Sequence, residues 1–174
     1  MPQARLVRRP LYLRGRRWMQ IGPGLTTGPG LRLDAFPISP ENGPVLRIGR
    51  DVQINDYVHI GAVHSVIIGD RVLIASKVFI SDHNHGKTKG PGAHDHPNIP
   101  PISRQLVHAE VVIEDDVWIG EFVSVLPGVR IGKGSIVGTM SVVTRDVPAY
   151  TMVAGSPARI LKRFNFAMSA WEKV

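Results

Sequence analysis

Aliphatic residues recur at every sixth position over most of the chain, and a small residue or a carboxamide often follows each of them. The regular positions are Ile48, Ile54, Ile60, Ile68, Ile74, Ile80, Ile113, Ile119, Val125, Ile131, Val137 and Val143, with a weaker copy at Ile21, Thr27 and Leu33. A second set of smaller residues falls four positions later, at Val52, Val58, Val72, Val78, Val117, Val123, Val129, Ser135 and Ser141. A period of six matches neither a free α-helix nor simple strand alternation, but it is typical of a coiled parallel sheet with short flat faces.

Each hexad predicts one face of such a coil. The aliphatic residue points into a narrow prism, and the small residue after it lets the next face close, so that stacked coils bury a continuous Val/Ile core. With three faces per turn, about 18 residues make one coil, and the hexads amount to roughly five coils. We therefore predict an all-β solenoid, with a Val/Ile-rich sandwich as the alternative.

Two stretches interrupt the period, and interruptions in a solenoid usually project as loops on one face. The short one spans residues 40–45 and the long one about 82–110, which is rich in glycine and proline. Such residues discourage regular structure. A long loop in a compact domain is usually functional or disordered, and this one follows directly on two histidines, which favours function.

The six-residue period ends at Pro148. Apolar residues then recur at spacings of three and four, at Ala158, Ile160, Leu161, Phe164, Ala167, Met168 and Trp171. This spacing predicts a short C-terminal helix that covers the end of the coil stack. The expected organisation is a basic segment at 1–19, a β-helix domain at 20–156 with its loop at about 82–110, and a helical tail at 157–174.

The composition indicates the number of domains and the cellular compartment of the protein. The length of 174 residues suits one domain, and the absence of cysteine excludes a disulfide framework and thiol catalysis. It also favours a reducing compartment, so that we expect a cytoplasmic protein. No apolar run reaches the roughly 18 to 20 residues that span a bilayer, and the N-terminus lacks the apolar core of a signal peptide.

The net charge of +7 is concentrated near the N-terminus. The arginines that precede the first carboxylate, Asp34, are Arg5, Arg8, Arg9, Arg14, Arg16, Arg17 and Arg32. Such a cluster could attract nucleic acid, an anionic membrane surface or a phosphorylated ligand, or could simply be a solvated arm. The low aromatic content and the lack of a nucleic-acid-binding motif argue against nucleic acid.

Two histidines, His83 and His85, stand where the regular pattern stops. Histidine can accept and return a proton near neutral pH, although isolated histidines are often only solvated or hydrogen-bonded. If the segment is extended, the two imidazoles share one face. Asp82 is then a candidate partner for one of them.

Several C-terminal motifs carry a specific resemblance. They are Val117–Gly120, Pro127–Val129, Ile131–Gly132, Ser141–Pro148 and Val153–Arg159. With them, about residues 20–165 resemble the hexapeptide-repeat O-acetyltransferases. Asn55-Asp56-Tyr57, the histidine motif and the long loop are similar to the sugar-modifying branch, which includes maltose, galactoside and surface-polysaccharide acetyltransferases.

The resemblance implies a left-handed parallel β-helix and a homotrimer with active sites between neighbouring subunits. It implies acetyl-CoA as cosubstrate, a sugar hydroxyl as acceptor, no metal, and a place in surface polysaccharide or lipopolysaccharide biosynthesis. Family members use one histidine at the start of the loop as general base. Alignment without gaps places that base on His85, and a two-residue gap places it on His83.

Further roles follow from the resemblance residue by residue. Asn55 falls where related enzymes place an asparagine that faces the acceptor, and Trp118 resembles a tryptophan that borders the groove; Asp82 joins them as a candidate on the acceptor side. The pantetheine arm maps onto Glu121, Thr139 and Thr144, and the nucleotide phosphates map onto Arg145, Arg159 and Lys162. Thr139-Met140 replaces the Ala-Gly common in the family, which leaves an acyl group other than acetyl open.

Two other functions remain open at this point. Trimeric zinc carbonic anhydrases share the expected fold, and the pairs His83/His85 and His94/His96 offer imidazole ligands. A noncatalytic trimeric scaffold would need neither histidine. Zinc content and acetyl-CoA turnover distinguish these alternatives from an O-acetyltransferase.

Overall fold

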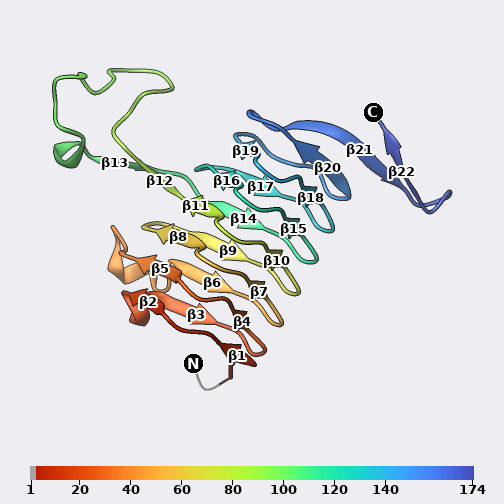
Figure 1. Ribbon diagram of the computed structural model, residues 1–174. Coiled ribbons are helices and arrows are strands. Elements are labelled where there is room, and N and C mark those ends of the chain that lie inside the picture. Colours follow the sequence, from red (N-terminus) through yellow and green to blue (C-terminus); the bar gives the residue numbers. More distant parts are fainter. Residues whose placement is uncertain (1–2) are drawn as a thin grey trace.

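The computed structural model describes residues 3–174, which wind into a stack of coils with three parallel sheets as its faces (Figure 1). Sheet A contains β1 (Leu6–Val7), β4 (Thr26–Thr27), β7 (Gln53–Ile54), β10 (Leu73–Ile74), β15 (Trp118–Ile119), β18 (Ile136–Val137) and β20 (Thr151–Ala154). Sheet B contains β2 (Leu11–Arg14), β5 (Leu31–Ala35), β8 (His59–Ala62), β11 (Phe79–Ser81), β16 (Ser124–Val125) and β19 (Val142–Val143). Sheet C contains β3 (Met19–Ile21), β6 (Leu46–Ile48), β9 (Val66–Ile68), β14 (Val111–Ile113) and β17 (Arg130–Ile131).

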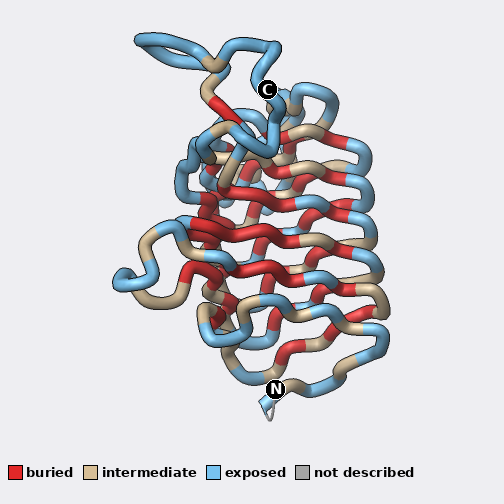
Figure 2. The backbone as a smooth tube through the Cα atoms, turned by 90° about the vertical axis from the view of Figure 1, so that its left-hand side faces the viewer, coloured by how far each residue is buried: buried red, intermediate tan, exposed pale blue. Residues whose placement is uncertain are grey.

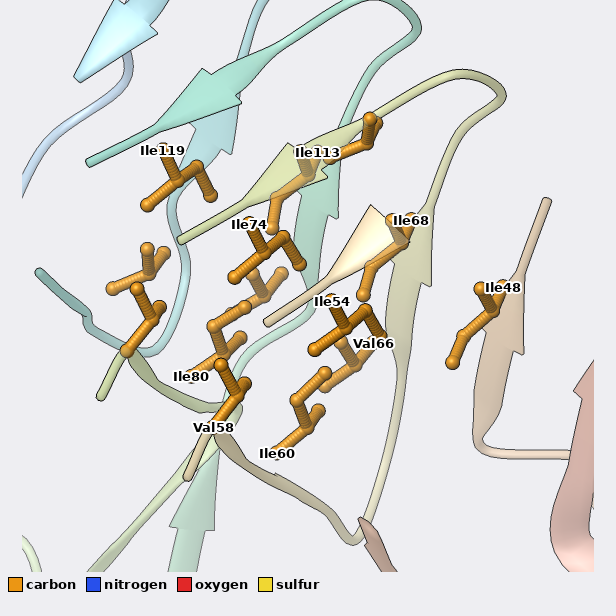
Figure 3. Close-up of a cluster of buried hydrophobic side chains, with 14 of the residues drawn as sticks. Ile48, Ile54, Val58, Ile60, Val66, Ile68, Ile74, Ile80, Ile113 and Ile119 are labelled. Atoms are coloured by element: carbon orange, nitrogen blue, oxygen red, sulfur yellow. The ribbon is translucent and has the colours of Figure 1, made fainter. Parts of the chain in front are cut away.

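The hexad positions form the core, as the sequence predicts. Strands of successive coils pair in unshifted parallel register, so that Ile54, Ile74 and Ile119 stand in one column inside the stack (Figure 3). All three are completely buried. The smaller residues four positions on are buried as well, and Figure 2 shows buried strands separated by exposed turns. Adding coils therefore extends one continuous apolar core.

The corners between faces depend on residues in the left-handed backbone region. At the corner between sheets A and B, Tyr57, Lys77 and Phe122 have φ of 55°, 59° and 55° in three successive coils, and Gly30 occupies the same place in the coil below with φ of 74°. This conformation is costly for residues other than glycine. Hydrogen bonds between coils hold it, for example from the amide of Lys77 to the carbonyl of Asp56 at 2.8 Å.

The N-terminal residues belong to the coil stack. Strands β1 and β2 pair in parallel with β4 and β5, and β3 begins at Met19 after a 3-10 turn, η1 (Arg16–Trp18). The expected boundary at residue 20 therefore lies inside a strand. Arg5 and Arg14 form ion pairs with Asp51 and Asp34 of the coils above, which ties this segment to the domain.

The prediction of a C-terminal helix is wrong. Residues 159–173 form a hairpin of β21 (Arg159–Asn165) and β22 (Ala170–Lys173), which adds to β20 in antiparallel order. A spacing of four also fits a strand, because Ile160 and Phe164 then lie on the same, half-buried face. The open edge of β20 supplies backbone partners, and the ring of Phe164 packs on that of Trp171 across the hairpin at 5.4 Å. These interactions outweigh the helical pattern.

Both interruptions of the period project from the stack, as expected. The short one contains η2 (Pro40–Asn42). The long one leaves after β11 as β12 (His83–His85), passes through η3 (Pro101–Ser103), and returns as β13 (Leu106–His108), which pairs with β12 in antiparallel order (Figure 1). Within residues 3–174, no helix is long and apolar enough to cross a membrane.

Candidate active site

A groove of 760 Å³ lies between the outer face of sheet B and the base of the long loop. Its floor comes from β2, β5, β8 and β11, which stack in register. Its wall includes His83 and His85 of β12, Leu106 of β13 and Ile102 of the loop. The groove therefore contains both histidines that the sequence singles out.

Asp82 is the buried anchor at the base of the loop, and its side chain has no exposed surface. It accepts hydrogen bonds from the backbone amides of Val63, His64 and Ser65 at 3.0, 2.7 and 2.8 Å. Its Oδ1 lies 2.9 Å from Nδ1 of His83. Burial alone would raise the pKa of the Asp82 carboxyl, but the hydrogen bonds from His83 and the three amides outweigh burial and lower it. An ionised Asp82 fixes the orientation of the His83 ring.

The His83 ring is held from a second side by Ser81. The Ser81 hydroxyl lies 3.2 Å from Nδ1 of His83 and donates to the His83 carbonyl at 3.1 Å. With Nδ1 facing Asp82 and Ser81, Nε2 is the ring nitrogen left to meet a ligand. The side chain is 22% exposed, so that the ring reaches the groove while its position is fixed.

His85 is more open. It pairs with Leu106 across the β12–β13 hairpin and is exposed. Its ring centroid lies 6.4 Å from that of His83, with the ring planes nearly perpendicular. The extended conformation of β12 agrees with the expectation from sequence. Within residues 3–174, the His85 ring makes no hydrogen bond or ion pair, so both of its nitrogens can meet a substrate.

Gly61 leaves an opening in the middle of the floor. On the outer face of sheet B it stands in register with Asp34 below and Ser81 above. A Cβ atom at this position would lie 3.4 Å from Cε1 of His83 and 4.0 Å from Nε2 of His59. Because glycine has no side chain, the groove passes without interruption from the histidines to the lower strands.

Charged side chains occupy that lower part of the groove. Asp34 of β5 receives both Nε and Nη2 of Arg14, each at 2.6 Å, and Nε of Arg32 at 2.7 Å. Nε2 of His59 lies 3.0 Å from the same carboxylate. Three side chains from three neighbouring strands thus converge on one carboxylate.

The relatives of this chain agree with its fold. Residues 110–145 match the family described as bacterial transferase hexapeptide (six repeats). WbbJ of Escherichia coli strain K12, a candidate lipopolysaccharide biosynthesis O-acetyl transferase, is 48% identical over 169 residues, which cover 97% of this chain and 84% of WbbJ. The chain belongs to the hexapeptide-repeat acetyltransferases.

Solved structures of this family share its architecture, a left-handed parallel β-helix. A hexapeptide-repeat acetyltransferase from Vibrio cholerae O1 biovar eltor, in complex with acetyl coenzyme A, has a TM-score of 0.61 and 29% identity; the match covers 88% of this chain and 70% of that one. A maltose O-acetyltransferase from Clostridium difficile 630 has a TM-score of 0.68 and 26% identity, with coverage of 86% and 72%.

Two of the expected acceptor residues lie away from the histidines of this acetyltransferase. Asn55 lies between β7 of sheet A and β8 of sheet B, at the edge where the strands of sheet B begin. His83 and His85 follow β11, at the opposite edge, where the strands of sheet B end. Its amide oxygen accepts a hydrogen bond from Gln53 at 3.0 Å. Trp118 lies on sheet A with 50% of its surface exposed. Within one chain, Asp82 contacts His83, whereas Asn55 and Trp118 lie away from both histidines.

The expected donor-side residues all lie in the last coils. Glu121 and Thr139 are exposed at the corner between sheets A and B, and the amide of Met140 donates to the carbonyl of Glu121 at 2.8 Å. Thr144 and Arg145 are exposed just after β19.

The two remaining donor-side residues, Arg159 and Lys162, lie on β21. Within residues 3–174, neither of them nor Arg145 forms an ion pair. These cationic groups are therefore available to a ligand.

The other histidine pair does not join the site. His94 contacts the carbonyl of Gly90 at 3.1 Å, and His96 accepts a hydrogen bond from the amide of Asn98 at 3.2 Å, both within the loop. In the part of the chain that the structure describes, no three His, Cys, Asp or Glu side chains group closely enough to hold a metal ion.

Sequence reasoning missed Asp34, His59 and Gly61 as groove residues. Arg14 and Arg32 were recognised only as members of a cationic cluster. The available signal was the alternation Arg32-Leu33-Asp34, which places two charges on one face of a strand. The hexad registers of β5, β8 and β11 could have aligned Asp34 with Gly61 and Ser81.

Proposed function

We propose that this protein transfers the acetyl group of acetyl-CoA to a hydroxyl of a sugar in surface polysaccharide or lipopolysaccharide biosynthesis. The observation that carries the proposal is the pair of imidazoles at the wall of an open groove, one anchored by a buried carboxylate and one free. The names of the relatives support the reaction, since WbbJ is a candidate lipopolysaccharide O-acetyl transferase and the Vibrio cholerae structure holds acetyl coenzyme A.

The reaction needs a base, because a sugar hydroxyl is a poor nucleophile until its proton is removed. A neutral imidazole takes this proton as the hydroxyl oxygen bonds to the thioester carbon. The tetrahedral oxyanion then collapses, the carbon–sulfur bond breaks, and the imidazolium returns the proton to the CoA thiolate. The products are the acetyl ester and free CoA, and the histidine returns to its starting state.

We assign the base to His85. Ungapped comparison with the family motif supports this choice, as does its exposed ring with both nitrogens free of protein partners. His83 is held by Asp82 and Ser81, and its Nε2 orients the acceptor beside the base. His83 is the alternative base, because a carboxylate at Nδ1 fixes the ring and leaves Nε2 to accept a proton.

The site is completed by a neighbouring subunit of a homotrimer. Asn55 and the histidines lie at opposite edges of sheet B, so one chain cannot bring them to a single sugar, whereas adjacent chains around a three-fold axis can. Trp118 borders the same intersubunit groove. Glu121, Thr139 and Thr144 line the pantetheine arm, and Arg145, Arg159 and Lys162 bind the phosphates of CoA, for which guanidinium groups have suitable geometry.

The protein acts in the cytoplasm, where acetyl-CoA is made, and in peripheral contact with an anionic membrane surface. The arginines Arg9, Arg16 and Arg17 support this contact, since they form no ion pair within residues 3–174 and lie exposed on the first coil. Basic residues near a membrane surface each contribute about 1 kcal/mol of attraction to anionic lipids.

The assignment is tested by replacing each histidine in turn. His85→Ala should lower the rate of acetyl-CoA-dependent thiol release with a sugar acceptor by a factor of roughly 10² to 10⁴, with acetyl-CoA binding by calorimetry unchanged. His94→Ala is the matched control, because His94 lies in the same loop but outside the groove. Near-normal turnover of His85→Ala together with loss of activity in His83→Ala would move the base to His83.

A further inference from the structure

The groove continues below the histidines to Arg14, Arg32, Asp34 and His59, here called the arginine cluster. It lies on β2, β5 and β8. Strands of a sheet lie about 4.8 Å apart, so Arg32 on β5 is two strand spacings, or ~10 Å, from β11, which leads into the histidines. A substrate hydroxyl beside His85 can therefore belong to a molecule that also contacts the cluster.

Asp34 holds the two guanidinium groups in place without neutralising both. Its side chain is only 8% exposed, whereas those of Arg14 and Arg32 are 51% and 45% exposed. Arg14 uses Nε and Nη2 on this carboxylate and Arg32 uses Nε. The Nη1 group of Arg14 and both terminal nitrogens of Arg32 keep their N–H donors for another acceptor.

The charge balance of the groove is positive. Among the described residues that line it, Arg14, Arg32 and Asp34 are the ones of the Arg, Lys, Asp and Glu types, which gives one net positive charge with the histidines neutral. Arg50, by contrast, pairs with Asp70 at an exposed corner, and neither residue lines the groove.

Aromatic rings stand beside the cluster. Phe36 lies under the Arg14 guanidinium at 5.9 Å, and Phe79 lies 5.5 Å from the His59 ring. Phe36 and Phe79 are both more than a third exposed and both line the groove. Apolar surface with a few convergent charged donors is typical of a ligand site. Here the aromatic rings suit the apolar face of a ring, and the guanidinium groups suit anionic oxygens.

We propose that the arginine cluster binds an anionic group, phosphate or carboxylate, of the acceptor saccharide and so selects charged over neutral acceptors. The group lies ~10 Å from the reacting hydroxyl, judged from the strand spacing. The proposal rests on the acetyltransferase function for the identity of the acceptor as a saccharide. The binding of an anion to the cluster does not depend on catalysis.

The test compares three sugars that differ mainly in charge: galactose, galactose 1-phosphate and galacturonic acid. Calorimetry on the full-length protein without acetyl-CoA should give at least tenfold tighter binding for one or both anionic sugars than for galactose. Arg32→Gln and Arg14→Gln should each remove most of that difference and leave galactose binding unchanged. Arg32→Lys, which keeps the charge but loses the guanidinium fork, should retain part of it.

Arg50→Gln is the matched control, since Arg50 is also an arginine paired with an aspartate but lies outside the groove; it should bind all three sugars as the wild type does. Melting curves establish that each variant is folded, and Arg14→Gln and Arg32→Gln provide independent tests should one of them not fold. Preference for galactose 1-phosphate identifies phosphate as the selected group, and preference for galacturonic acid identifies carboxylate. Equal binding of all three sugars, or equal loss in Arg50→Gln, would overturn the proposal.

Thiol release distinguishes the failure of this proposal from failure of the proposed function. Anion-selective binding without acetyl transfer to any sugar would contradict the acetyltransferase function and leave the cluster's role in place. Acetyl transfer with equal efficiency to neutral and anionic sugars would support the acetyltransferase function and contradict the role of the cluster. Where both hold, Arg32→Gln should raise KM for the charged acceptor at least tenfold with little change in kcat.

Discussion

Asp82 connects the coil stack to the base of the loop. Its carboxylate accepts three backbone hydrogen bonds from the corner of the coil below and orients His83 above. The motif in the sequence predicted that the histidines and Asp82 belong together. It could not predict which backbone amides Asp82 would bind, because those amides lie about 18 residues earlier and meet it only through the pitch of the coil.

Replacing Asp82 should affect stability in a pH-dependent way. Asp82→Ala leaves three backbone amides without an acceptor, two of them buried, and should lower the free energy of unfolding at pH 7 by about 2–4 kcal/mol. Because the folded-state pKa of Asp82 is lowered, its contribution is complete above the unfolded value of about 3.9 and is lost as pH falls through the folded value. Denaturant unfolding at several pH values measures both effects.

Asp70→Ala is the control for this prediction. Asp70 also accepts a hydrogen bond from a backbone amide, that of Arg50 at 2.8 Å, but it lies at an exposed corner. Its loss should lower the free energy of unfolding much less than the loss of Asp82 does, because solvent screens an exposed pair. A similar cost at both positions would contradict the special role of the buried carboxylate.

The long loop and the C-terminal hairpin show what can be predicted about elements. The sequence predicted the loop from a break in a strong period. The C-terminal segment was mistaken for a helix because spacings such as Ile160 to Phe164 fit both a helix and a strand. The free edge of β20 decided between them, and an edge is a property of the folded stack that no local pattern contains.

Shortening the loop should separate its role in the groove from the stability of the fold. Replacing residues 87–104 by Asn-Gly keeps Gly86 opposite Gln105 and gives β12 and β13 a favoured hairpin turn. The melting temperature should stay within a few degrees of the wild type, because none of the removed residues is buried. KM for the acceptor should rise at least tenfold, since Ile102 is lost from the groove wall. An unchanged KM would mean that the distal loop does not contact the acceptor.

At the scale of the whole molecule, the period of six was sufficient to predict the three faces, the stacked core and its members. Handedness came from resemblance and relatives, because the spacing of buried residues is the same in either hand. The positions of Asn55 and the histidines at opposite edges of sheet B likewise became apparent only once strands were placed in space.

The continuous core predicts a strong dependence on residues in the middle of the stack. Ile74→Ala should lower the free energy of unfolding by about 2–5 kcal/mol, because Ile74 is completely buried in register between Ile54 and Ile119 and its loss leaves a cavity. Ile102→Ala, at an isoleucine that is 83% exposed, should change it by no more than about 0.5 kcal/mol. Equal effects on chemical denaturation would contradict a core built from stacked hexads.

The regular spacing of strands in sheet B sets the length of molecule that fits the groove. Asp34 of the arginine cluster, the opening at Gly61 and Ser81 stand in register on the successive strands β5, β8 and β11, so these strands are separated by whole multiples of the ~4.8 Å strand spacing. The distance from the cluster to the histidines can therefore change only by whole strand spacings. Insertion of one coil between β5 and β8 would lengthen the measured distance by one step, and acceptor length should follow the number of coils.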